Sequence, residues 1–171
     1  MTRPDLQDAF EHHLWANLVV LDVCSKLSPE QLASQVPGTY GSILETMRHI
    51  VGADDWYLYV LTGGTREMVD EESMSLDELR PVMDEHVTAW AALLAERRDP
   101  EEVVIAHRKD GSEGHAPLGI RLAQVVHHGT DHRSQICTGL TGLGIEPPDI
   151  DVWAFGEQQG SVFDSTGGSA D

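Results

Sequence analysis

The sequence predicts an all-α fold in which a few long helices form one bundle. Four long segments place apolar residues at the three- and four-residue spacing of an amphipathic helix. Strand signals are confined to one short stretch, and no unit repeats at a fixed period. A chain of 171 residues, 40% of them hydrophobic, is long enough for one domain with a substantial core and short for two.

The first helix is expected from about Asp5 to Lys26, directly after Pro4. Proline suits the first turn of a helix because its missing N–H group would have no partner there. The apolar stripe of this helix consists of Leu6, Phe10, Leu14, Leu18 and Leu21. Asn17 lies beside the stripe and therefore needs hydrogen-bond partners or a polar cavity. Residues 28–30, Ser-Pro-Glu, predict a short capped turn after the helix.

Two capping boxes predict the starts of the second and third long helices. In such a box a serine side chain accepts a hydrogen bond from the backbone three residues later, and a glutamate there bonds back. The pairs are Ser42 with Glu45, opening a helix to about Thr62, and Ser75 with Glu78, opening one to about Arg97.

The fourth long helix is expected from about Leu118 to Leu143. The stretch 103–117 before it has the composition of either a small hairpin or an irregular connection, and the connection is favoured. Residues 149–158 predict one short C-terminal helix or turn. The Gly/Ser/Asp-rich end, 161–171, is expected to be a disordered tail, so the domain is assigned to residues 1–160. The uneven connections leave both an up-down-up-down order and a crossover open.

The charge balance is strongly acidic and argues against polyanionic partners. The chain has 29 Asp and Glu against 11 Lys and Arg, a net charge of −18. This field would repel nucleic-acid phosphates and anionic lipids, so neither nucleic acid nor a membrane is expected as a partner. Two cysteines without a CxxC pair, no signal-peptide pattern and no apolar run of about 20 residues favour the cytoplasm.

His128 and His132 lie four residues apart on the fourth helix and therefore on one face of it. His49 has an equivalent place on the second long helix, at the edge of the apolar stripe. Three imidazoles can share one metal ion, or all three can be partly exposed and bonded to water. The remaining histidines lack ligand spacing and are expected at the surface: His12, His13, His86, His107, His115 and His127.

Two motifs resemble the DinB-like superfamily. Residues 44–50, which end in His49-Ile50, followed by Asp54-Asp55-Trp56, look like the first ligand motif of that superfamily. Residues 128–136, together with the preceding His127, resemble its late motif, Asn-His-x-x-x-His-Arg-Gly-Gln, with His127 in place of Asn and Ser134 in place of the usual Gly. The likeness extends to Trp15-Ala16-Asn17 and to the closing segment 147–153, and so spans essentially the whole chain up to the tail.

The resemblance implies a fold, an assembly and a cofactor. It implies a DinB-like four-helix bundle with a long crossover connection, often a homodimer. It also implies one divalent metal ion held by His49, His128 and His132. Imidazole ligands suit zinc or nickel, with iron or copper as further candidates. Related proteins include mycothiol- and bacillithiol-dependent transferases, so a low-molecular-weight thiol cosubstrate is a further expectation.

Three histidines leave a position open for a small-molecule substrate, as in a catalytic zinc site. Glu45, one turn before His49, is the candidate general base. Asn17, Gln124 and Gln135 are candidates for orienting the ligands from behind. Arg133 either pairs with a substrate carboxylate or faces the other side of its helix.

Three functions stay open at this point. The first is a metal-dependent thiol S-transferase, which the resemblance places slightly ahead. The second is a metal-dependent hydrolase with Glu45 as its base. The third is a non-catalytic, stress-related bundle that the metal stabilises.

Overall fold

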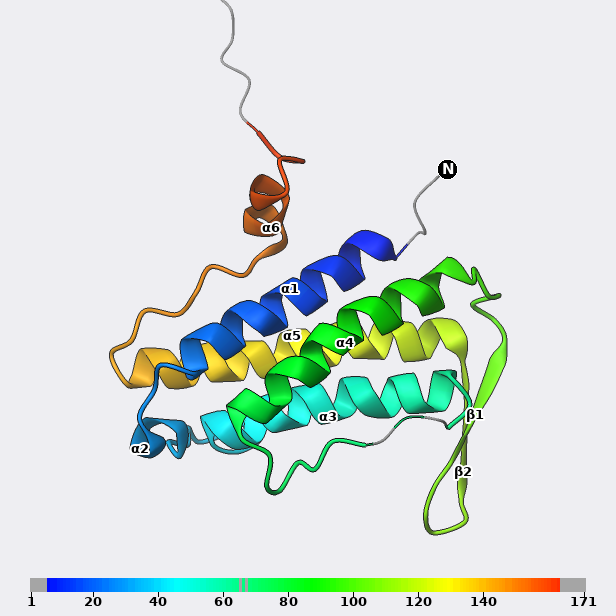
Figure 1. The fold of residues 1–171 in the computed structure, drawn as a ribbon, viewed down its shortest axis with the longest axis horizontal. Helices are drawn as coiled ribbons and strands as arrows, with labels where there is room; N and C mark the ends of the chain where they lie inside the picture. The colour runs from blue at the N-terminus through cyan, green and yellow to red at the C-terminus, as the bar shows by residue number, and fades with distance from the viewer. Residues whose placement is uncertain (1–5, 65, 67, 164–171) are drawn as a thin grey trace, which may run out of the picture.

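The computed structural model describes residues 6–64, 66 and 68–163, and it is mostly helical (Figure 1). Within that part of the chain there are six helices and one two-stranded sheet. In order these are α1 (Gln7–Cys24), α2 (Pro29–Leu32), α3 (Ile43–Leu61), α4 (Leu76–Ala95), β1 (Val103–His107), β2 (Glu113–Pro117), α5 (Leu118–Gly142) and α6 (Val152–Gln158). Each long helix therefore lies within two residues of the bounds expected from the sequence.

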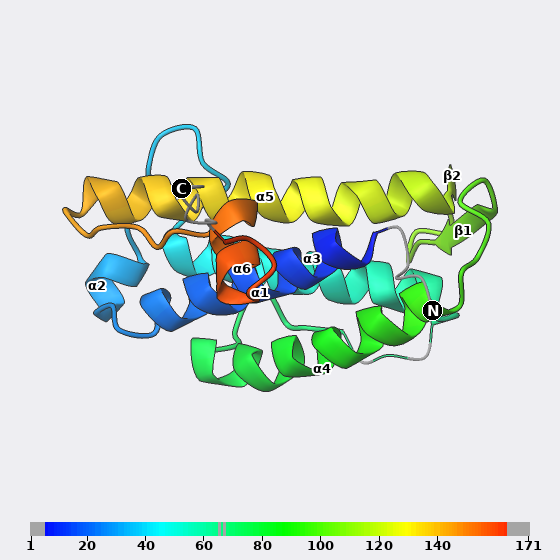
Figure 2. The same cartoon turned by 90° about the horizontal axis from the view of Figure 1, so that it is seen from above.

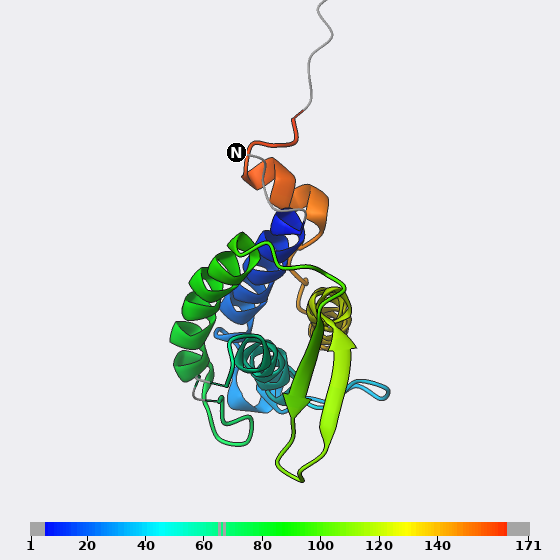
Figure 3. The ribbon, with the colours of Figure 1, turned by 90° about the vertical axis from the view of Figure 1, so that its right-hand side faces the viewer.

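The four long helices pack around a common interior. Helix α1 contacts α4 and α5, and α3 contacts the same two helices (Figure 3). Two apolar clusters fill this interior, one toward each end. One cluster contains Val20, Leu21, Met47, Ile50, Leu79, Met83, Ile136 and Leu140. The other contains Phe10, Leu14, Leu58, Leu61, Trp90, Leu93, Leu118, Leu122 and Val125.

A layer of buried polar side chains separates the two apolar clusters. We call it the polar layer; its members are His13, Asn17, Asp54, Asp55, His86 and Arg133, all at most 2% exposed. On α3, α4 and α5 these residues lie between the positions that enter one cluster and those that enter the other. On α1 this holds for Asn17, whereas His13 lies beside Leu14 at the edge of the second cluster. The order of the clusters also gives the helix directions: α3 and α4 run one way, and α1 and α5 run the other.

The connection from α3 to α4 crosses back along the length of α3. Arg48, near the start of α3, donates hydrogen bonds to the backbone oxygens of Glu72 and Met74. Asp55, farther along α3, accepts one from the backbone N–H of Val69. Figure 1 shows the same return path before α4 begins. The two helices therefore run in the same direction, which decides between the two chain orders left open by the sequence.

Strands β1 and β2 form an antiparallel hairpin, so the expectation of an irregular connection was wrong. Val103 pairs with Pro117 at one end, and His107 with Glu113 at the other. Alternate residues of β1 are buried, and Arg121 on α5 donates to two of the hairpin's carbonyl oxygens, those of Val104 and Gly114. The sequence pattern is weak evidence for this hairpin because Arg121, which anchors it, lies outside the strands and β2 is poor in strand-forming side chains.

Helix α6 lies over α1 (Figure 2). The ring of Phe155 packs against those of His12 and Trp15, and His12 also hydrogen-bonds the Ile150 carbonyl at 2.8 Å. His12 is therefore buried, contrary to the expectation of a surface group. Of the expected disordered tail, Ser161 and Val162 bond back to α6, and residues 164–171 lie outside the described part of the chain. None of the described helices has the length and apolar character needed to span a bilayer.

Candidate metal centre

Three histidine side chains from two helices converge at one point between α3 and α5. A ring nitrogen of each of His49, His128 and His132 lies within 4.8 Å of the others. Nε2 of His49 and Nε2 of His128 are 3.1 Å apart. The ring centroids are 4.4 to 5.0 Å apart. The i, i+4 spacing on α5 and the position of His49 on α3 thus produce the grouping expected from the sequence.

Two of these rings have the far nitrogen, Nδ1, occupied by an acceptor. Nδ1 of His49 lies 3.0 Å from the Glu71 carboxylate, so this nitrogen carries the proton and donates it. Nδ1 of His132 lies 3.1 Å from Oε1 of Gln135, and the same oxygen accepts the backbone N–H of Tyr40 at 2.8 Å. With Nδ1 as donor in both rings, each Nε2 carries a lone pair that could bind a cation.

The separation of the nitrogens fits a small divalent ion. Zinc binds imidazole nitrogen at about 2.0–2.1 Å, which puts neighbouring nitrogens of a tetrahedral site roughly 3.3 Å apart. The His49–His128 distance of 3.1 Å is close to that value. Among the residues that the structure describes, the group has no fourth His, Cys, Asp or Glu. Three imidazole nitrogens, with a carboxylate and an amide behind two of them, could therefore hold a metal ion that keeps an open position.

Burial favours the neutral form, which a metal needs, at His128 and His132. Burial, with a smaller contribution from the neighbouring His132 and His49, lowers the pKa of His128 to about 4. Burial also lowers the pKa of His132, although the hydrogen bond to Gln135 opposes this. A ring that is neutral at physiological pH offers its lone pair without first losing a proton.

Tyr40 and Glu71 belong to this site, and neither was expected from the sequence. The Tyr40 ring stacks on His49 with centroids 4.0 Å apart and meets His132 edge-on at 5.4 Å. Glu71 reaches His49 across Gly52, where a Cβ atom would lie 2.7 Å from the Glu71 Cδ. Both residues are in connections, whose paths helical periodicity does not determine. The only sequence signal for a residue packed against α3 here was Gly52, a glycine in the middle of a helix.

The other proposed site residues lie in different environments. Gln135 contacts His132, whereas Gln124 is exposed. Glu45 closes the capping box of α3 by accepting the Ser42 backbone N–H at 2.7 Å. Its bonds with Ser42 hold the pKa of this exposed carboxyl below its usual range, which weakens it as a base. Glu45 also lines a cavity of about 610 Å³ together with Tyr40 and Glu71.

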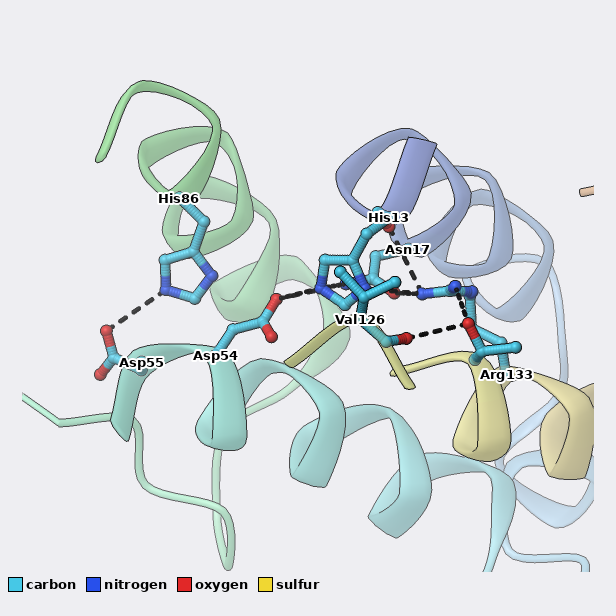
Figure 4. Close-up of polar contacts among 8 residues, drawn as sticks. His13, Asn17, Asp54, Asp55, His86, Val126 and Arg133 are labelled. Carbon is cyan, nitrogen blue, oxygen red and sulfur yellow. Dashed lines mark hydrogen bonds and ion pairs between the residues drawn. The ribbon is translucent and has the colours of Figure 1, made fainter. Parts of the chain in front are cut away.

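Asn17 lies in the polar layer and makes no hydrogen bond to the three ligands. Its Nδ2 is 3.3 Å from Asp54, and its Oδ1 accepts Arg133 Nη1 at 2.7 Å. Arg133 is 2% exposed, so it pairs with buried groups and does not present its guanidinium to solvent or to a substrate. His13 and His86 are likewise buried, which corrects their assignment to the surface. His13 bonds the carboxylate of Asp54, and His86 bonds that of Asp55, the next residue on α3 (Figure 4).

Comparison with known proteins supports the family suggested by the motifs. A search of curated proteins gave no match. The sequence model of the DinB family matches residues 1–163, which include all three clustered histidines and nearly the whole chain. The chain belongs to the DinB family.

Proposed function

We propose that this protein binds one divalent metal ion through His49, His128 and His132, as the working centre of a four-helix bundle with a crossover. The observation that carries the proposal is the convergence of the three rings, two of them with Nδ1 already bonded to an acceptor. Zinc or nickel suits three imidazole nitrogens best. Elemental analysis of protein purified without a histidine tag should give one metal per chain, and His128→Ala should lose it. Unchanged metal content in this variant would contradict the proposal.

The favoured activity is thiol S-transfer. A divalent ion with an open position lowers the pKa of a thiol that binds there. The side chains around the centre would then arrange the reactants: Tyr40 covers His49 and His132, and Glu71 holds the His49 ring. The thiol sulfur would displace a leaving group from carbon of a second substrate, and the thiol proton would leave to solvent or a nearby carboxylate.

Transfer is tested with metal-loaded protein, candidate low-molecular-weight thiols and a chromogenic electrophile. We expect turnover that needs the metal and is absent in His128→Ala. Turnover equal in wild type and His128→Ala, or none with any thiol, would count against transfer.

Hydrolysis is the second candidate, supported by the carboxylates of Glu45 and Glu71 along the cavity of about 610 Å³. For this reaction Glu45 is the proposed base. Loss of ester or amide hydrolysis in Glu45→Gln with normal metal content would support it. Glu71→Gln is the matched variant: because Glu71 bonds a ligand, its loss should alter metal affinity as well. Hydrolysis unaffected by Glu45→Gln would remove the proposed base.

A homodimer is also proposed, following the family resemblance. An open apolar groove of about 800 Å³ between α1, α4 and α6 supports it, with Leu18, Val87 and Phe155 among its lining residues. Apolar surface of this kind commonly marks an interface. Light scattering should give twice the mass of the chain, and Val87→Glu should reduce it to the mass of one chain. A monomeric wild type would contradict this proposal and leave the metal centre untouched.

The third candidate is a non-catalytic bundle in which the metal mainly stabilises the fold or the dimer. This candidate is favoured if chelation lowers the melting temperature strongly while no substrate class shows turnover. Metal-dependent turnover would exclude it.

A further inference from the structure

The polar layer contains two histidine–aspartate pairs built on consecutive residues of α3. Asp54 bonds His13 of α1, with Oδ2 and Nε2 2.8 Å apart. Asp55 bonds His86 of α4, with Oδ1 and Nε2 3.2 Å apart. Figure 4 shows the two carboxylates directed to different helices. Because all four residues are at most 2% exposed, these are buried interactions of the same chemical kind.

The pair at Asp54 extends to α5, the helix that carries two ligands. Arg133 Nη1 lies 3.1 Å from His13 Nδ1 and 2.7 Å from Asn17 Oδ1. A guanidinium only donates, so His13 Nδ1 is the acceptor and His13 Nε2–H donates to Asp54. We call His13, Asn17, Asp54 and Arg133 the His13 cluster. It joins α1, α3 and α5 through one neutral imidazole between a cation and an anion.

The His13 cluster lies next to the two ligands on α5 and includes a residue of α3, the helix of the third ligand. Arg133 directly follows His132. Gly129 directly follows His128, and a Cβ atom there would lie 2.6 Å from His13 Nδ1. Asp54 is on α3, the helix of His49. Any rotation or slide of α5 against α3 that would separate the three ligands must therefore break these buried contacts.

We propose that His13, Asn17, Asp54 and Arg133 are positioning residues that set the metal affinity of the centre. This inference rests on the proposed metal site. Ligand atoms must lie within about 0.2 Å of their required distances for tight binding. The apolar clusters hold the ligand helices α3 and α5 together by contacts that have no preferred direction. The His13 cluster adds buried hydrogen bonds, whose geometry is directional. The pair of Asp55 and His86 joins α3 to α4, which carries no ligand.

The test compares His13→Gln with His86→Gln, the same substitution in the two pairs. The probe is Zn²⁺, titrated against a chelator, with the melting temperature of the metal-free protein measured in parallel. Both variants should lose thermal stability. Only His13→Gln should weaken zinc binding, by about 10–100-fold, as is common when a group behind the ligands is lost. In His86→Gln the Kd should stay within about twofold of wild type.

Arg133→Lys and the Co²⁺ absorption spectrum give a second measure. Lysine keeps the charge but has one nitrogen in place of the planar fork, whose Nη1 bonds His13 and Asn17 while Nη2 donates to Thr130. Affinity should therefore fall and the Co²⁺ bands should shift. If His13→Gln does not fold, Asn17→Ala replaces it, since the His13–Asp54 bond stays in place there. A wild-type Kd in the His13-cluster variants, or an equal weakening in His86→Gln, overturns the inference. Failure of the wild type to bind zinc would instead overturn the metal site itself.

Discussion

At the residue scale, Gly129 is required by the crowding of the His13 ring against α5. A Cβ atom at this position would lie 2.6 Å from His13 Nδ1 and 2.9 Å from Arg133 Nη1. Gly129→Ala should therefore lower the free energy of unfolding by about 1–3 kcal/mol, as overpacking does, despite the better helix propensity of alanine. Urea unfolding measures the change.

Gly142→Ala, at the end of the same helix, is the matched control because nothing lies within 4 Å of an added Cβ. Alanine there should be neutral or stabilising by up to about 1 kcal/mol. Equal stability of Gly129→Ala and wild type would show that His13 is not held against α5 as described.

Asp55 makes the stability of the protein depend on acid pH. Burial raises the pKa of this carboxyl, but hydrogen bonds from His86 and Arg66 outweigh burial and bring the pKa below its ordinary value. A lowered folded-state pKa gives stability that is present above the unfolded pKa of about 3.9 and is lost as pH falls through the folded pKa. The difference in unfolding free energy between wild type and Asp55→Asn should therefore shrink below about pH 4.

Urea unfolding of both proteins from about pH 7 to about pH 3 measures this difference. A difference that stays constant over the whole range would mean that the charge of Asp55 contributes nothing to stability. A loss of stability at acid pH that both proteins share comes from other carboxyl groups, and it cancels when the two unfolding free energies are subtracted.

Residue patterns identified the three clustered histidines, but not the residues that support them. Helical spacing puts His49, His128 and His132 at the edges of apolar stripes, and the family resemblance groups them as one ligand set. His13 and His86 were assigned to the surface because their partners, Asp54 and Asp55, lie on another helix. The residue pattern within one helix does not show which side chains of a second helix it contacts. Glu71 and Tyr40 were missed for a related reason, since their positions depend on how two connections fold back over α3.

At the element scale, local capping interactions mark where two of the long helices, α3 and α4, begin. The boxes predicted at Ser42 and Ser75 are both formed. Ser75 Oγ accepts the Glu78 N–H, and the Glu78 carboxylate accepts the Ser75 N–H at 2.7 Å. Ser75→Ala should destabilise the protein by about 1 kcal/mol and leave metal content unchanged.

Thr88→Ala is the control for this prediction, because Thr88 is exposed in the middle of the same helix. It should have little effect or be slightly stabilising, since alanine is the better helix former. Calorimetry of both variants decides: equal melting temperatures for Ser75→Ala and Thr88→Ala would mean that the cap contributes nothing.

Helix bounds follow from capping and periodicity, whereas helix directions do not. The same four helices permit several chain orders, and the actual order depends on contacts of the crossover connection such as those of Arg48 and Asp55 with its backbone. The hairpin was not expected for a similar reason: its anchor, Arg121, lies on α5. Contacts between elements therefore decide the features that sequence reasoning left open or missed.

At the scale of the whole molecule, the proposed metal would join segments that are distant in the chain. His49 and His128 are 79 positions apart, so the unfolded chain does not hold them together. The net charge of −18 adds a long-range attraction for cations. Metal bound to the native state alone therefore stabilises the complete fold by RT ln(1 + [L]/Kd).

Zinc at about 100 times its Kd should add about 2.7 kcal/mol to the free energy of unfolding. For a chain of this size that corresponds to a rise in melting temperature of roughly 5–10 °C. The rise should grow with the logarithm of free zinc, disappear with a chelator and be absent in His128→Ala. Because His128 is a half-buried side chain whose removal leaves the polar layer intact, this variant should still fold without metal. A melting temperature that does not respond to zinc in the wild type would exclude the native-state metal site.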